Sequence, residues 1–376
     1  MRIGFDAKRA FKNNTGLGNY SRMIISALLQ YYPDVELFLF TPDTKGPYAQ
    51  FFDNGIRYQT SNLKHLTVVT PSGLWRLFPA LWRTFGIAAE IRRRKLDVYH
   101  GLSHELPRGR VGETKLVVSM HDLIVWRYPM HFPLIDRVIY KLKQLHACRR
   151  ADTIVAISKQ TEVDLVDLMG VDPQKINVVY QSCDDILRKA VSSEQRNSVR
   201  QRYSLPERYI LCVGTIEQRK NQATVVEAIS MVPKELHLVI VGRKTPYYTT
   251  VADKVNHHGL DSRVHFLQGV DFADFPTLYS EAVASVYMSI FEGFGIPVLE
   301  SLACGTPVVA SSRSSIPEVG GNAALYADPD KPQEIANQIN ALLSDSLLYN
   351  DMQHRATIQA DNFTQKKIAS DLLKLY

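Results

Sequence analysis

The pattern that most constrains the fold is an alternation, in both halves of the chain, of short apolar runs with segments whose apolar residues recur at helical spacing. Each apolar run ends in polar residues or glycine, as a buried strand does. In the second half, the run at residues 209–214 precedes a helical segment at 221–230, and another run follows at 236–242. Strands that alternate with helices form parallel sheets with helices on both faces. The sequence therefore predicts an α/β protein.

The chain has 376 residues, too many for one ordinary core, so two domains are expected. We expect residues 1–184 and 185–360 to form them. In parallel sheets, ligands bind at the carboxyl ends of the strands, which makes each loop after a strand a candidate site. The expected strands are 2–6, 35–40, 98–100, 116–120 and 153–157, then 209–214, 236–242, 264–266, 284–288 and 306–310. The expected helices include 20–29, 221–230, 275–281 and 297–304.

Charge is unevenly distributed along the chain. Residues 1–150 contain 23 Lys and Arg against 11 Asp and Glu, whereas the whole chain has 44 against 38. A basic half suggests an anionic partner: nucleic acid, an anionic membrane surface or a phosphate-bearing acceptor. No nucleic-acid recognition module is visible and the rest of the chain is acidic, so nucleic acid is not an expected partner.

Composition and cysteine usage indicate a globular enzyme of the cytoplasm. Apolar residues make up 45% and charged residues 22% of the sequence. Cys148, Cys183, Cys212 and Cys304 are far apart and form no C-x-x-C pair, so reduced thiols are expected. The N-terminus lacks an apolar signal core, and no stretch approaches the ~18 apolar residues of a membrane span. A cytoplasmic protein is expected, one that could still lie peripherally on the inner face of the plasma membrane.

The stretch EGFGIPVLE at residues 292–300 is the most specific motif. Glu292 follows a predicted strand, and Glu300 lies on the next predicted helix. The glycines allow close backbone approach, and the helix start offers N–H groups to an anion. Carboxylates can accept hydrogen bonds from sugar hydroxyls. The motif thus suits a sugar–diphosphate–ribose ligand, although two glutamates at this spacing alone are as often part of a plain surface loop.

A second motif, VGTIEQRKN at residues 213–221, places Arg219 and Lys220 after a strand, at the start of a helix. Two cations beside helix N–H groups can clamp a diphosphate and stabilise it as a leaving group. A basic pair taken alone is more often simply solvated. Its position directly after a strand favours the functional interpretation.

Together these motifs resemble those of glycosyltransferase family 4, whose members have the GT-B fold: two Rossmann-like domains with parallel sheets that face a central cleft. The strings AISK at 156–159, ACGTPVVA at 303–310 and SIPEV at 315–319 continue the resemblance in the family's order. QSCD at 181–184 departs from it, because many members have Asn-Gly there, and this leaves the hinge geometry open. The resemblance implies that a last helix, within 361–376, packs back on an acceptor-binding N-terminal domain. It also implies that the anomeric configuration is retained.

The resemblance further implies a role for each motif residue. Arg219 and Lys220 would hold the diphosphate, Glu300 the ribose and Glu292 the sugar hydroxyls. The loop 268–271 would lie beside the base. The other residues expected to bind the donor are Gly16, Gly18, Gly214, Gly269, Val270, Phe294, Gly295 and Ile296.

Gly16 and Gly18 belong to a predicted loop between the first strand and the helix at 20–29. A dinucleotide fingerprint would need a third glycine where the chain has Ser21, and an acidic residue at the end of the second strand, which is followed by Thr41. NAD binding is therefore disfavoured. By resemblance this loop faces the donor diphosphate, and a plain tight turn is the alternative.

His121 and Asp122 directly follow the predicted strand 116–120. A histidine at the carboxyl end of a strand could polarise a reacting centre near neutral pH. In the resembling family a histidine at this place lies by the transferred sugar and the acceptor, so His121 is an expected catalytic residue and both are expected to contact the acceptor. A structural His-Asp pair is the alternative.

Residues 74–95 mix aromatic residues with arginines in a predicted helical segment. Such a mixture suits an interfacial helix against anionic lipid, and equally a core helix with a solvated basic end. The aromatic and basic residues concerned are Trp75, Phe78, Trp82, Phe85, Arg76, Arg83, Arg92, Arg93, Arg94 and Lys95.

No metal and no cofactor are expected, because the single D-x-D string, at Asp328 and Asp330, lies in a turn-like context away from the other motifs. The sequence thus predicts a retaining, metal-independent transferase that moves a hexose from a nucleoside-diphosphate sugar to a saccharide or lipid-linked acceptor. The motifs at 292–297 and 315–319 most resemble those of bacterial mannosyltransferases that use GDP-mannose, so the resemblance implies GDP-mannose as the donor, and UDP-sugars stay open. A nucleotide-sugar epimerase of the same fold and a non-catalytic nucleotide-binding protein are the other classes.

Overall fold

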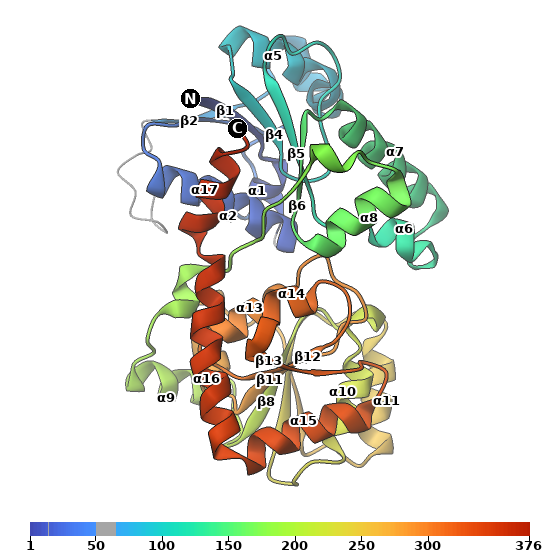
Figure 1. Ribbon diagram of the computed structural model, residues 1–376, viewed down its shortest axis with the longest axis vertical. Helices are drawn as coiled ribbons and strands as arrows, with labels where there is room; N and C mark the ends of the chain where they lie inside the picture. The colour runs from blue at the N-terminus through green and yellow to red at the C-terminus, as the bar shows by residue number, and fades with distance from the viewer. Residues whose placement is uncertain (14, 50–64) are drawn as a thin grey trace. The chain divides into compact units, whose positions relative to one another are not determined.

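A computed structural model describes residues 1–13, 15–49 and 65–376. The chain forms two compact units (Figure 1). Unit 1 comprises Met1–Ser182 together with Gln365–Tyr376, and unit 2 comprises Cys183–Thr364. Within the described residues, no helix has both the length and the apolar character needed to cross a bilayer.

Unit 1 is built on a parallel sheet of seven strands in the order β3-β2-β1-β4-β5-β6-β7. Its strands are β1 (Arg2–Asp6), β2 (Glu36–Phe40), β3 (Leu66–Val69), β4 (Val98–Gly101), β5 (Lys115–Met120), β6 (Thr153–Ala156) and β7 (Ile176–Val178). Ile3 and Phe5 of the central β1 are completely buried. The apolar runs predicted five of these strands. The edge strands β3 and β7 were not predicted, because each is short and partly exposed.

Helices flank this sheet, and α17, the last of them, packs against α2 within unit 1. The helices of unit 1 are α1 (Lys8–Lys12), α2 (Gly16–Tyr31), α4 (Pro79–Leu81), α5 (Ile87–Arg94), α6 (Ile124–Arg127), α7 (Leu134–Arg150), α8 (Lys159–Met169) and α17 (Gln365–Leu373). Thus the chain leaves unit 1 after Ser182 and returns to it with α17.

Unit 2 contains a parallel sheet of six strands in the order β10-β9-β8-β11-β12-β13. Its strands are β8 (Tyr209–Val213), β9 (His237–Val241), β10 (Val264–Leu267), β11 (Ala284–Tyr287), β12 (Val308–Ser311) and β13 (Ala324–Ala327). Its core includes the fully buried Ile210, Leu238 and Val309. All but the edge strand β13 were predicted. The order places β8 beside β11, which decides which loops meet.

The helices of unit 2 are α9 (Ser193–Arg202), α10 (Gln222–Ile229), α11 (Tyr248–His257), α12 (Phe275–Ser280), α13 (Ile296–Ala303), α14 (Ile316–Gly320), α15 (Pro332–Ser344) and α16 (Ser346–Ala360). Helix α13 begins and ends as its sequence predicts. Pro297 lies in the first turn, where a missing N–H costs nothing, and Gly305 follows the helix with a φ of 70°.

Candidate functional site

The loops after β8 and β11 meet at the carboxyl edge of the unit 2 sheet, because these strands are neighbours. The backbone N–H of Ile290 donates to the carbonyl of Arg219 at 2.9 Å. The Ser289 Oγ atom lies 3.1 Å from the same carbonyl. Two motifs that lie some 70 residues apart in the sequence are thus joined through their backbones.

Glu292 is the centre of this junction and is only 9% exposed. Its Oε1 atom lies 2.7 Å from Nη1 of Arg219 and 2.6 Å from Nζ of Lys220. The same oxygen accepts hydrogen bonds from the hydroxyls of Tyr287 at 2.7 Å and Ser289 at 2.6 Å. Burial acts to raise the pKa of Glu292, but Lys220 and Arg219 outweigh it and hold the pKa at about 2. Glu292 is therefore a carboxylate at neutral pH.

The two cations of this cluster also have other partners. Nη2 of Arg219 lies 2.6 Å from Glu217, whose side chain is 37% exposed. Nη1 of Arg219 donates to the carbonyl of Phe291 at 2.7 Å. Lys220 donates to the Tyr287 hydroxyl as well as to Glu292. Two cations and two carboxylates thus balance each other, and an incoming anion can compete with the more exposed carboxylate, that of Glu217, for Arg219.

The backbone around Glu292 is fixed by the loop after β12. The Ser314 hydroxyl accepts from the N–H of Glu292 at 3.1 Å and donates to its carbonyl at 2.6 Å. The Ser315 Oγ atom lies 2.9 Å from the carbonyl oxygens of both Glu292 and Phe294, so its one proton can bond either of them. Gly295, just before α13, has a φ of 107°, which L side chains rarely adopt. The contacts of Ser314 and Ser315 thus fix the backbone of the loop that carries Glu292.

Three further residues expected to bind the donor, Gly214, Phe294 and Ile296, lie near the cluster of Arg219, Lys220 and Glu292 and differ in how buried they are. Phe294 is 2% exposed and its ring packs edge-on against Phe363, so its side chain is buried. Gly214 directly follows β8, and a Cβ there would lie 3.8 Å from the Lys220 side chain. Ile296 opens α13.

Glu300 lies on α13 in a different environment from Glu292. Its Oε2 accepts a hydrogen bond from the Tyr279 hydroxyl at 2.8 Å. Among the described residues, no Lys or Arg lies within ion-pair distance of it. Burial raises the pKa of Glu300 to about 7. The two glutamates of the motif therefore differ in charge state: one is held ionised, and the other changes protonation near neutral pH.

Gly269 and Val270 follow β10, at the sheet edge and two strands away from β8. Gly269 has a φ of 65°. The Tyr203 hydroxyl accepts from the N–H of Asp271 at 3.3 Å and donates to the buried Asp274 at 2.8 Å. Sequence reasoning missed Tyr203, which directly follows α9 and holds this loop.

In unit 1, His121 ends up at the carboxyl edge of its sheet, directly after β5. Its Nε2 lies 2.8 Å from the carbonyl of Leu102, so Nε2 carries the proton and Nδ1 is an acceptor. Burial, with a smaller effect of His104, lowers the pKa of His121 to about 3, so the ring is neutral at pH 7. The Tyr20 ring meets it edge-on at 4.5 Å. Asp122 accepts from the N–H of Ile124 at 3.1 Å, at the start of α6.

A buried polar network that sequence reasoning missed lies beside His121. Ser119 Oγ is 2.8 Å from both the Tyr20 hydroxyl and Nε2 of His100. Nδ1 of His100 is 2.5 Å from the hydroxyl of Tyr376. His100 lies on β4 near its carboxyl end, so the rule that singled out His121 could also have found it. Tyr376 carried no comparable signal.

The prediction of a glycine-rich loop at 15–19 is wrong, because this stretch is the start of a helix. Helix α2 begins at Gly16, so Gly16 and Gly18 lie in its first turn and not in a loop before residue 20. Gly18 packs so tightly on the preceding turn that a Cβ would lie 1.9 Å from the carbonyl oxygen of Asn13, whereas Gly16 has open space. The helix can begin this early because Gly18 permits that approach.

The segment expected to be helical at 74–95 is helical, but it is divided into several pieces. The segment consists of a 3-10 turn (Gly73–Leu77), α4, a π-helical turn (Trp82–Gly86) and α5. Trp82 is buried, and Arg83 pairs with Asp6 at 2.5 Å and with Glu105 at 2.7 Å. The buried Asp6 explains why this arginine points inward.

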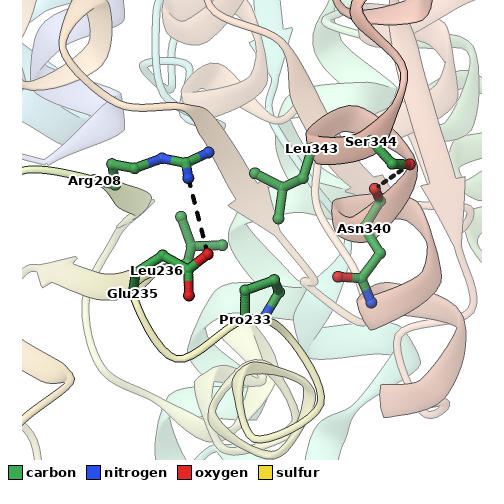
Figure 2. Close-up of a pocket in the computed structure, with 7 residues that line it drawn as sticks. All are labelled: Arg208, Pro233, Glu235, Leu236, Asn340, Leu343 and Ser344. Atoms are coloured by element: carbon green, nitrogen blue, oxygen red, sulfur yellow. Dashed lines mark hydrogen bonds and ion pairs between the residues drawn. The ribbon is translucent and has the colours of Figure 1, made fainter.

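Two further features lie outside these clusters. Asp328 and Asp330 both bind Arg313, at 2.5 and 2.7 Å, so this D-x-D string forms an ion-pair group. A hollow of about 310 Å³ lies near the starts of β8 and β9 (Figure 2). Arg208 and Glu235, which line it, face each other at 4.0 Å. It is at the amino ends of the strands, opposite to the edge where parallel sheets bind ligands.

Solved structures with the same architecture identify the fold. A glycosyltransferase from Rickettsia africae aligns with a TM-score of 0.76 at 17% identity, over 100% of this chain and 97% of that one. Anabaena HepE, solved with UDP and glucose, aligns with a TM-score of 0.74 at 19% identity, over 100% and 98%. The fold is that of the GT-B glycosyltransferases, as predicted.

Sequence comparison assigns the family. The profile for "Glycosyltransferase Family 4" matches residues 15–185, and that for "Glycosyl transferases group 1" matches residues 194–359. O-antigen chain mannosyltransferase B of Escherichia coli is 30% identical over 76% of this chain and 75% of its own. O-antigen chain mannosyltransferase RfbU of Salmonella typhimurium is 28% identical over 86% and 85%. The chain belongs to glycosyltransferase family 4 and is a glycosyltransferase.

Proposed function

We propose that this enzyme transfers mannose from GDP-mannose, with retention of configuration, to a saccharide or lipid-linked acceptor in cell-surface polysaccharide assembly. The observation that carries the donor site is the cluster of Arg219, Lys220 and Glu292 at the carboxyl edge of the unit 2 sheet. The names of the E. coli and Salmonella relatives support mannose as the sugar and O-antigen as the setting.

In this proposal Arg219 and Lys220 bind the donor diphosphate and neutralise the charge that it gains as it leaves. The diphosphate replaces Glu217 at Arg219, since Glu217 is the more exposed of its two carboxylate partners. Two cations at the leaving group make a divalent metal ion unnecessary, and no other cofactor is required. Backbone N–H groups from the start of α13 complete the anion site, whereas the N–H of Gly214 is already donated to the carbonyl of Val241 at 2.9 Å.

Glu292 binds sugar hydroxyls through its second oxygen, since the contacts described above all go to Oε1. Glu300 binds the ribose, and Gly269 and Val270 lie beside the base. The acceptor-binding residues of the proposal are in unit 1. His121, neutral and with Nδ1 as an acceptor, and Asp122 contact the acceptor, while Gly16 and Gly18 at the start of α2 face the diphosphate.

The reaction breaks the bond between the anomeric carbon and the diphosphate oxygen and forms a bond to an acceptor hydroxyl on the same face. The hydroxyl proton passes to the departing diphosphate. Because the acceptor attacks on the face that the diphosphate leaves, the configuration is retained without an enzyme-bound sugar. The transition state resembles an oxocarbenium ion, and stabilising the negative charge of the leaving group lowers its energy.

A UDP-sugar donor is the second candidate, because solved relatives of this fold hold UDP and UDP-glucose. Thermal shifts with GDP, UDP and ADP rank the bases, since a ligand at 100 times its Kd stabilises by roughly 2.7 kcal/mol. Labelled GDP-mannose and UDP-sugars, incubated with and without a lipid-linked acceptor, then test the reaction. Acceptor-dependent transfer of mannose is expected. Donor turnover without acceptor would indicate an epimerase, and binding without turnover a non-catalytic protein.

Substituting Glu292 by alanine tests the assigned roles. The variant is expected to lose at least ~100-fold in kcat while retaining its fold by circular dichroism. Near-normal transfer by this variant, or a product of inverted configuration, would contradict the proposal.

An anionic membrane surface at the inner face of the plasma membrane, contacted through residues 74–95, is also proposed as a partner. Exposed Leu74, Leu77 and Phe78 support it.

A further inference from the structure

Tyr287, the last residue of β11, contacts two members of the cluster of Arg219, Lys220 and Glu292. Its hydroxyl donates to Oε1 of Glu292 at 2.7 Å and accepts from the ammonium group of Lys220. The same ammonium nitrogen lies 4.9 Å from the centre of the Tyr287 ring. Because Tyr287 is only 3% exposed and gives its one hydroxyl proton to Glu292, it can influence the site only through these neighbours.

The Glu292 oxygen that Tyr287 contacts has more donors around it than it can bond strongly. Within 2.7 Å of Oε1 lie Nη1 of Arg219, Nζ of Lys220 and the hydroxyls of Tyr287 and Ser289. A carboxylate offers about four lone-pair sites on its two oxygens, so one oxygen accepts about two strong hydrogen bonds. Two cations and two hydroxyls therefore share this oxygen, and two of the donors can leave it while its lone pairs stay filled.

The cations are the donors that are able to leave. The side chains of Arg219 and Lys220 are 22 and 14% exposed, and each ends a long flexible stem. Tyr287 and Ser289 are 3 and 0% exposed and lie at the end of β11 and just after it. Burial, together with the charge of Glu292, raises the pKa of Tyr287 well above its usual 10, so the hydroxyl keeps the proton that it donates. An incoming anion can thus attract the two cations while both hydroxyls remain on Oε1.

Tyr287 holds Glu292 more firmly than Ser289 does. The Ser289 Oγ atom is 2.6 Å from Oε1 of Glu292, but it is also 3.1 and 3.3 Å from the carbonyl oxygens of Arg219 and Phe291, so its one proton has three possible acceptors. The Tyr287 hydroxyl donates to Glu292 and accepts from Lys220. Departure of Lys220 therefore leaves the bond between Tyr287 and Glu292 intact.

We propose that Tyr287 is a positioning residue that allows Arg219 and Lys220 to exchange Glu292 for the diphosphate of the donor. The cations turn to the phosphate oxygens, and the Tyr287 hydroxyl stays on Oε1 and holds the carboxylate with Oε2 available to the sugar. Without this hydroxyl, departure of the cations leaves a buried, ionised oxygen short of donors, which makes the exchange unfavourable. The inference rests on the proposed function, because it requires the cluster to bind a diphosphate.

Calorimetric titration of GDP into Tyr287→Phe tests the proposal. The variant keeps the ring and loses the hydroxyl, and it is expected to bind GDP at least ~10-fold more weakly than the wild type. UDP is expected to show the same proportional loss, because the exchange involves the diphosphate and not the base. Ser289→Ala, which removes the other hydroxyl, is expected to weaken GDP binding by a smaller factor.

Tyr209→Phe is the matched control. Tyr209 is completely buried at the start of β8, the strand beside β11, and its hydroxyl donates to the carbonyl of Leu278 at 2.8 Å. The substitution removes the same group from the opposite edge of the same sheet, so GDP affinity is expected to stay within ~2-fold of the wild type.

A double-mutant cycle with Glu292→Gln separates this positioning from a general loss of structure. The neutral amide does not need two donors when the cations leave. In the Glu292→Gln background, Tyr287→Phe is therefore expected to change GDP affinity by less than ~2-fold. Circular dichroism verifies that each variant is folded at the temperature of the titration.

Several outcomes would overturn the inference and leave the assigned donor site standing. These are wild-type affinity in Tyr287→Phe, a loss confined to one of the two nucleotides, an equal loss with and without the Glu292 carboxylate, and a larger loss in Ser289→Ala. A wild-type protein that binds neither GDP nor UDP would instead contradict the donor site itself, and the inference with it.

Discussion

The two glutamates of the donor motif are predicted to have opposite effects on stability. In the folded protein the pKa of Glu292 is about 2, below its ordinary 4.5, whereas that of Glu300 is about 7. A group with a lowered pKa contributes stability above its unfolded pKa and loses it as the pH falls from about 4.5 towards 2. A group with a raised pKa contributes stability below about 4.5 and loses it as the pH rises through 7.

The magnitude follows from these differences. Each tenfold change in proton affinity corresponds to ~1.4 kcal/mol, so each carboxylate accounts for up to about 3 kcal/mol, with opposite sign at pH 8. Glu292→Gln also leaves Arg219 and Lys220 without their shared carboxylate. For a domain of this size, 1 kcal/mol shifts the melting temperature by ~2–4 °C. At pH 8, Glu292→Gln is expected to melt roughly 6–12 °C below the wild type, and Glu300→Gln above it.

Differential scanning calorimetry at pH 5 and pH 8 checks this prediction, with the transition of unit 2 followed separately if the units melt apart. The advantage of Glu300→Gln should shrink at pH 5, where the wild-type carboxyl is already protonated in the fold. The reasoning is refuted if both substitutions shift the melting temperature in the same direction at pH 8. It is also refuted if Glu292→Gln melts within ~2 °C of the wild type.

Three further predictions address other parts of the chain. Glu217→Gln removes the exposed carboxylate that competes with the donor for Arg219, and it should tighten GDP binding by ~2–3-fold in calorimetric titration. Glu227→Gln, the control, breaks a remote ion pair with Lys254 and should leave GDP binding unchanged. Gly18→Ala should lower the free energy of unfolding, measured in urea, by well over ~1 kcal/mol, because its Cβ would lie 1.9 Å from the carbonyl oxygen of Asn13. Gly16→Ala, which has open space, should raise this free energy by ~0.5 kcal/mol, and the reverse order would contradict the packing described. Tyr376→Phe removes the hydroxyl that bonds His100 in the buried network beside His121, and it should change kcat and the pH profile of kcat while the donor KM stays constant. An unchanged pH profile would confine this network to a structural role.

The sequence correctly predicted the strands that are buried on both faces of their sheets. The strands around β1 and β8 are continuous apolar runs, which no alternative structure explains as well. β3, β7 and β13 were missed because edge strands are short and half-exposed, so that no apolar run marks them. The start of α2 was missed because glycines in a first turn resemble a loop in sequence.

The candidate site was predicted in part for a related reason. The motifs were assigned to one ligand, and the structure brings Arg219, Lys220 and Glu292 into direct contact. The ion pairs themselves could not be foreseen, because they depend on β8 and β11 being neighbours, and strand order is set by the packing of the whole sheet. Contacts over still longer separations, such as that between His100 and Tyr376, leave no local pattern at all.

Calorimetric titration of GDP into two variants tests most directly whether the donor binds at the cluster. Arg219→Met with Lys220→Met removes both cations at the carboxyl edge of the unit 2 sheet, whereas Arg208→Met removes the cation that lines the hollow near the amino ends of the same strands. The double variant is expected to lose at least ~100-fold in GDP affinity, and Arg208→Met to bind like the wild type. Wild-type affinity in the double variant, or lost affinity in Arg208→Met, would contradict the assignment of the donor site.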